Sequence, residues 1–119
     1  MIRVFLVEDH IFARHALHLM IETEPDVEVV GEAARGREAL RLIPLCEVDV
    51  VVCDYQLPDI DGLEVTYRLL LQRDDYRILI LSGIDHGPIP KELIAAGAAP
   101  DAGDVMLIVD GVTSVGGSP

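Results

Sequence analysis

Three acidic side chains stand directly after short apolar runs, where they could bind a cation together. Glu8 and Asp9 follow the run at residues 2–7, and Asp54 follows the run at residues 48–53. Carboxylates that lie close together repel one another, and a divalent cation relieves that repulsion. Oxygen ligands favour a hard ion such as Mg²⁺, which keeps part of its water shell. The alternative is that each acid is an ordinary solvated residue at the end of a strand.

A hydroxyl group extends this set of polar side chains. Ser82 follows another apolar run, at residues 77–81. If the three runs are neighbouring parallel strands, their carboxyl ends meet at one edge of the sheet. We therefore expect three carboxylates and one hydroxyl to converge at that edge. The simpler alternative for Ser82 is a strand-end hydroxyl that bonds to nearby backbone.

The apolar runs are typical of strands that are buried on both faces. They are rich in Val, Ile and Leu and lack a clean alternation of polar and apolar residues, as in a parallel sheet covered by helices. Apolar residues at helical spacing fall between the runs, which indicates repeated strand–helix–strand units. The expected strands are residues 2–7, 27–31, 48–53, 77–81 and 105–109, and the expected helices are residues 12–21, 36–43, 63–71 and 91–96.

Composition indicates one acidic domain. The chain has 119 residues, of which 50% are hydrophobic and 4% aromatic, and its formal net charge is -12. This charge argues against direct binding to nucleic acid or to an anionic membrane surface. No apolar run approaches the length of a membrane span, and the N-terminus lacks the pattern of a signal peptide. Cys46 and Cys53 make neither a disulfide framework nor a metal-binding spacing, so a reducing, cytoplasmic setting is expected.

The C-terminal residues depart from the repeated pattern. Residues 111–119 contain three glycines, a proline and several β-branched residues, so no helix is expected there. We expect residues 1–110 to form the domain and residues 111–119 to be a flexible or exchanged tail. Without a last helix, one face of the sheet would need cover from a partner chain, which predicts a homodimer.

Three segments surround the acidic residues and the hydroxyl. They read Leu-Val-Glu-Asp-His at residues 6–10, Val-Val-Cys-Asp-Tyr-Gln-Leu-Pro-Asp-Ile-Asp-Gly at residues 51–62, and Ile-Leu-Ser-Gly at residues 80–83. Together they resemble the receiver domain of two-component response regulators, and residues 24–33 look like the NarL/FixJ-type subgroup. The resemblance implies a flavodoxin-like, doubly wound α/β fold. Its five-stranded parallel sheet would have the order 2-1-3-4-5, with the last helix missing or replaced.

The resemblance also implies a role for each candidate site residue. Asp54 would accept a phosphoryl group from a sensor histidine kinase, and Ser82 would contact that group as the switch hydroxyl. The Mg²⁺ ligands would be Glu8, Asp9, Asp54 and the backbone carbonyl of Gln56. Pro58 and Gly62, four and eight residues after Asp54, would shape the loop. The chain would act in signalling and catalyse at most its own phosphorylation and dephosphorylation.

The C-terminal third departs from the pattern of that family. The family places a Lys about twenty-two residues beyond the switch hydroxyl, and counting onward from Ser82 reaches Asp104. The aromatic switch residue falls on Asp101, and the one Lys of the chain is Lys91. A phosphorylated Asp54 would then lack a charge-assisted contact worth about 1.5–3 kcal/mol.

Two other functions are open at this point. The first is an atypical receiver that works without phosphorylation as a dimerisation or docking module, which the missing Lys and aromatic residue favour. The second is a phosphohydrolase of the haloacid dehalogenase type, which also uses a strand-end Asp as nucleophile. That class places a second Asp two residues further on, where this chain has Gln56.

Overall fold

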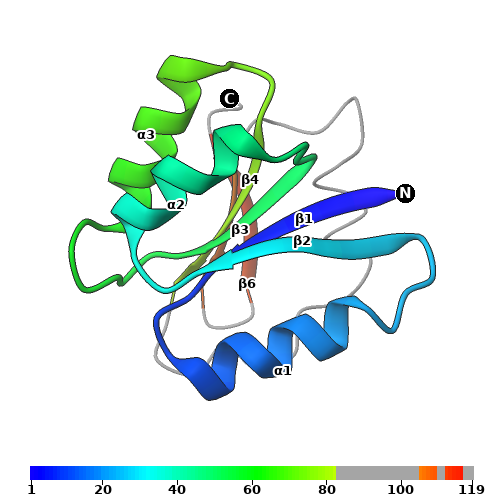
Figure 1. The fold of residues 1–119 in the computed structure, drawn as a ribbon. Helices are drawn as coiled ribbons and strands as arrows, with labels where there is room; N and C mark the ends of the chain where they lie inside the picture. Colours follow the sequence, from blue (N-terminus) through cyan, green and yellow to red (C-terminus); the bar gives the residue numbers. More distant parts are fainter. Residues whose placement is uncertain (83–104, 110–111, 117–119) are drawn as a thin grey trace.

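The computed structural model describes residues 1–82, 105–109 and 112–116, with side chains as far as Leu81 and the backbone path beyond it. Its centre is a six-stranded sheet in the order β2-β1-β3-β4-β5-β6 (Figure 1). The first five strands pair in parallel, and β6 pairs antiparallel with β5. The strands are β1 (Ile2–Val7), β2 (Val27–Ala33), β3 (Val50–Asp54), β4 (Arg77–Ser82), β5 (Val105–Val109) and β6 (Val112–Gly116).

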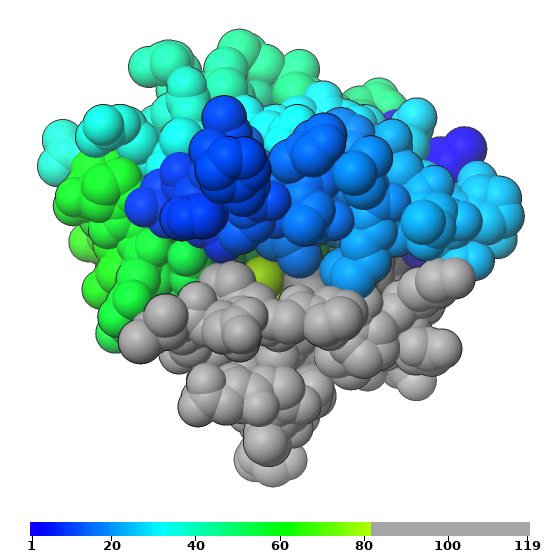
Figure 2. All heavy atoms as spheres, turned by 90° about the horizontal axis from the view of Figure 1, so that it is seen from below, coloured from blue at the N-terminus to red at the C-terminus, as the bar shows by residue number. Residues whose placement is uncertain are grey.

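Helices lie on both faces of this sheet. Helix α1 (Ile11–Ile21) packs on one face, and α2 (Gly36–Leu42) and α3 (Gly62–Gln72) pack on the other (Figure 1). A 3₁₀ helix, η1 (Ile43–Leu45), continues α2. Figure 2, viewed from the side of α1, shows this helix as an outer layer of the molecule. Together with the strand order, these layers confirm the predicted doubly wound α/β fold.

Burial on both faces explains why the apolar runs show no alternation. In β3, Val50 and Val52 pack in the core cluster on the α1 side, whereas Val51 and Cys53 pack in the cluster on the side of α2 and α3. All five residues of β3, including Asp54, are buried. A strand in this setting must be apolar on both faces, so a buried carboxylate at its last residue is unusual and suggests a functional role.

The C-terminal strand changes the predicted sheet from five strands to six. The backbone of β6 lies beside β5 of the same chain, whereas the sequence prediction placed residues 111–119 in a flexible or exchanged tail. The antiparallel pairing runs from Val109 opposite Val112 to Val105 opposite Gly116. The boundary between residues 1–110 and 111–119 stays a prediction.

Other predictions differ from the structure only at element ends or lie outside it. The second strand continues to Ala33, and the third begins at Val50. The expected helix at residues 91–96 lies outside the described residues, as do Lys91, Asp101 and Asp104. Within the described part of the chain, no helix is both long and apolar enough to span a bilayer.

Candidate functional site

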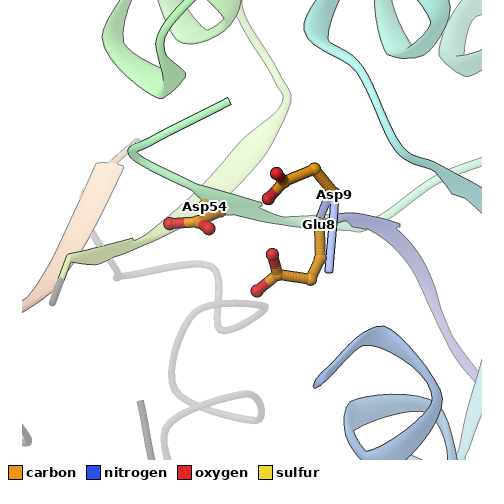
Figure 3. Close-up of side chains that lie close together, drawn as sticks. All are labelled: Glu8, Asp9 and Asp54. Atoms are coloured by element: carbon orange, nitrogen blue, oxygen red, sulfur yellow. The ribbon is translucent and has the colours of Figure 1, made fainter. Parts of the chain in front are cut away.

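The acidic side chains predicted from the sequence meet at the carboxyl edge of the sheet. Strands β1 and β3 are parallel neighbours with Val7 opposite Cys53, so Glu8 and Asp54 follow these two positions at the same level. Glu8, Asp9 and Asp54 each offer a carboxylate oxygen, and these oxygens all lie within 4.8 Å of one another (Figure 3). The three carboxylates form the acidic site.

The acidic site combines buried and exposed groups. Glu8 is 2% exposed and Asp54 is 8% exposed, whereas Asp9 is exposed to solvent. An ion could therefore reach the buried oxygens from the side of Asp9. The buried carboxylates would offer it ligands already stripped of much of their water.

Backbone N–H groups hold the two buried carboxylates in place. The amide of His10 donates to Oε2 of Glu8 at 3.2 Å, and the amide of Gln56 donates to Oδ1 of Asp54 at 3.2 Å. The amide of Tyr55 donates to the carbonyl of Leu81 at 2.7 Å, which joins the loop after β3 to the end of β4. The first two contacts orient the carboxylates of Glu8 and Asp54, and the third holds the loop that follows Asp54.

The electrostatics of the acidic site favour a cation. Burial raises the pKa of Glu8 to about 8; the His10 amide opposes that rise, and the nearby carboxyl groups of Asp54 and Asp9 add to it. An uncompensated anion in this position is therefore costly. Three carboxylate oxygens with one solvent-facing side suit a hard divalent ion such as Mg²⁺. The residues present thus fit this ion.

Gly62 allows α3 to begin against the end of β3. Its amide donates to the carbonyl of Tyr55 at 2.7 Å. A Cβ added at Gly62 would lie 2.5 Å from the carbonyl oxygen of Asp54 and 2.9 Å from Cα of Tyr55. Both neighbours are backbone atoms, so a side chain at this position would displace the segment that carries Asp54. Pro58 lies exposed in the same loop.

Ser82 lies at the matching end of the next strand. Leu81 pairs with Asp54, and Ser82 is the last residue of β4, where it pairs with Val109. The backbone of Ser82 is therefore at the same edge of the sheet as the acidic site. Its side chain lies outside the described part of the structure.

Sequence reasoning missed a carboxylate that links the loop after β3 to α2. Oδ1 and Oδ2 of Asp59 accept from the amides of Gly36 and Arg37, each at 2.9 Å. Arg35, the residue before the helix, makes no side-chain cap, so Asp59 caps α2 from 23 residues further along the chain. Slight burial raises the pKa of Asp59, but the backbone amides of Arg37, Ile60 and Gly36 outweigh it and lower the pKa to about 2. The weak signal was a helix start without a local capping residue.

The family model described as "Response regulator receiver domain" matches residues 4–100. The DNA-binding transcriptional activator DevR/DosR of Mycobacterium tuberculosis is 38% identical over 99 residues, which are 83% of this chain and 46% of that protein. This chain thus spans about half the length of that curated relative.

Two solved structures share the fold over most of this chain. A two-component response regulator of the LuxR family from Aurantimonas has a TM-score of 0.70 and 32% identity, covering 90% of this chain and 72% of the other. The response regulator TrrA of Thermotoga maritima, solved in complex with Mg²⁺–BeF, has a TM-score of 0.69 and 27% identity, covering 92% of this chain and 86% of the other.

Proposed function

Because this chain belongs to the response regulator receiver domain family, a signalling family, we propose that Asp54 accepts a phosphoryl group from a sensor histidine kinase. The observation that supports the proposal is the meeting of Glu8, Asp9 and Asp54 within 4.8 Å at the carboxyl edge of the sheet. Receiver domains bind Mg²⁺ at an acidic pocket, and this chain has such a pocket. We propose that the side chains of these three residues and the backbone carbonyl of Gln56 hold Mg²⁺.

In the proposed reaction Asp54 is the nucleophile. One carboxylate oxygen forms a bond to phosphorus while the bond from phosphorus to the histidine nitrogen breaks. The nitrogen keeps the bonding electron pair and takes a proton from solvent. The amide of Gln56 orients the Asp54 carboxylate through its contact with Oδ1. Mg²⁺, when bound, neutralises charge on the transferring phosphoryl group.

The remaining site residues act after or around the transfer. We propose that Ser82 donates its hydroxyl to the phosphoryl group, which is supported by the position of its backbone one residue beyond the partner of Asp54. Pro58 and Gly62 shape the loop that brings Gln56 to the metal. Because Lys91 is the one Lys of the chain and Asp104 stands where the family has a Lys, the aspartyl phosphate would be weakly stabilised.

The proposed partners are a sensor histidine kinase and a second copy of this chain, in a cytoplasmic setting. Direct binding of nucleic acid by these residues is not part of the proposal, because the net charge of -12 repels phosphate backbones. Neither alternative, the phosphorylation-independent docking module or the haloacid dehalogenase type of hydrolase, is supported by the comparisons.

Labelling with a small phosphodonor tests this function. The chain is incubated with acetyl phosphate and Mg²⁺, and its intact mass is measured. We expect an increase of one phosphoryl group in the wild type and in Asp74→Asn, a change at an exposed acid outside the acidic site. Asp54→Asn should show no increase. Labelling that persists in Asp54→Asn, or that is unaffected by removal of Mg²⁺ with a chelator, would refute the proposal.

A further inference from the structure

Arg14 connects α1 to the backbone of the acidic site. Its Nη1 donates to the carbonyl oxygen of Glu8 at 2.8 Å, and its Nε lies 3.4 Å from Oε1 of Glu32. The Arg14 side chain is 21% exposed, so its charge is mostly withdrawn from solvent. Arg14 thus contacts the main chain of a proposed ligand while its charge is paired elsewhere.

Glu8 lies just beyond the end of β1, and three contacts determine how its backbone continues. Its amide donates to the carbonyl of Ala33 at 3.0 Å, and its carboxylate accepts from the amide of His10. The carbonyl is fixed by Arg14. Because this carbonyl belongs to the peptide that joins Glu8 to Asp9, its direction sets the relative position of both carboxylates.

The partner of Arg14 is itself held by a chain of polar contacts. Nδ1 of His18 lies 3.0 Å from Oε2 of Glu32, and Nε2 of His18 lies 3.1 Å from Oε1 of Glu22. Glu22 also accepts from the amide of Val29 at 2.9 Å. Glu22 at the end of α1 and Glu32 of β2 are thus linked through His18, and Glu32 in turn pairs with Arg14. This arrangement limits the positions that the guanidinium can take.

From these contacts we propose that Arg14 is a positioning residue for the acidic site, acting through the backbone carbonyl of Glu8 to keep Glu8 and Asp9 in register with Asp54. The inference rests on the proposed function. Arg14 does not contact the ion or the phosphoryl group. It holds the peptide from which two proposed ligands project, as outer residues of metal sites do.

The sign of the effect separates positioning from bulk electrostatics. The chain carries a formal net charge of -12, and removal of one Arg makes it more negative. A purely electrostatic effect would therefore strengthen the binding of a cation. Positioning predicts the opposite, a weaker affinity, because the carboxylates of Glu8 and Asp9 would sample more arrangements.

Titration with Mg²⁺ alone tests the proposal. Affinity is measured by calorimetry, and amide NMR shifts of Asp9 and His10 follow the site. We expect Arg14→Met to bind Mg²⁺ about tenfold more weakly, the lower end of the range for outer contacts in metal sites. Arg14→Lys, which can keep the contact to the carbonyl, should recover most of that loss. Arg68→Met, the matched control, removes an Arg that pairs with Glu64 on α3 and should bind at least as tightly as the wild type.

Glu32→Gln provides a second variant if Arg14→Met does not fold. It leaves the contact to Glu8 in place but removes the charged partner of Arg14, so we expect a loss of Mg²⁺ affinity smaller than in Arg14→Met. The loss should exceed that in Glu64→Gln, which removes the same charge from an ion pair on α3. Wild-type affinity in folded Arg14→Met, or a loss in Glu32→Gln no larger than the loss in Glu64→Gln, would overturn the positioning role and leave the proposed function intact. A wild-type chain that binds no Mg²⁺ would instead overturn the proposed function, and the positioning role with it.

Discussion

Replacement of Gly62 by Ala tests the close approach of α3 to the acidic site. The added Cβ would lie 2.5 Å from the carbonyl oxygen of Asp54, about 0.9 Å inside ordinary contact at 3.4 Å. Neither this oxygen nor Cα of Tyr55 can rotate away, because both belong to the main chain. Overpacking of this kind costs about 1–3 kcal/mol. Ala in place of Gly in a helix returns about 0.5–1 kcal/mol, so the difference between the midpoints of the two ranges is a net loss of about 1 kcal/mol.

Urea unfolding measures this loss, and the phosphodonor reaction measures its effect on the acidic site. Gly36→Ala is the matched control, because Gly36 is likewise the first residue of a helix. Its added Cβ would meet side-chain atoms of Ile60 and Val65 at 2.5 and 2.8 Å and not the backbone that carries Asp54. Gly36→Ala should lower stability but leave the rate of labelling of the folded chain unchanged, whereas Gly62→Ala should lower both. A Gly62→Ala chain that is as stable as the wild type, or more so, would refute the reasoning.

Three further predictions follow from the same structure. Mg²⁺ at a hundredfold excess over its Kd should raise the free energy of unfolding by about 2.7 kcal/mol, as measured by urea titration, and Asp54→Asn should lose most of that gain. Asp59→Ala should lower the free energy of unfolding by about 1 kcal/mol near neutral pH, because α2 loses its cap. The stabilisation by ionised Asp59 is complete above the ordinary Asp pKa of 3.8 and is lost as pH falls toward about 2. The unfolding free energies of the wild type and the variant should therefore converge in acid. Burial lowers the pKa of His18, but its contacts with Glu32 and Glu22 outweigh burial and raise it above the ordinary 6.5. The stabilisation by protonated His18 is thus complete below pH 6.5 and is lost as pH rises through the raised pKa. NMR titration should place the His18 pKa above 6.5, and a value of 6.5 or lower would contradict this.

The acidic site could be predicted because its residues each follow the end of a strand in a parallel sheet. Glu8, Asp9 and Asp54 each follow an apolar run, and parallel strands bring such positions to one edge whatever the packing details are. The role of Gly62 could be expected only from the resemblance. Spacing alone does not reveal that a Cβ at Gly62 would lie 2.5 Å from the carbonyl oxygen of Asp54. Residues 51–62 could be recognised as one segment of the family pattern, but nothing in that pattern indicated that Asp59 caps α2.

Hydrophobic patterning by itself thus determined the parallel strands, the helices between them and the edge at which the acids meet, because burial on two faces leaves a clear mark on local sequence. Tertiary structure alone decided that Asp59 caps α2, that Arg14 holds the carbonyl of Glu8, and that Glu8 is buried beside two other acids. These features join residues from different elements through single hydrogen bonds or close contacts. Such contacts need atoms placed to a fraction of an ångström, and that placement arises only when the whole sheet and its helices pack together.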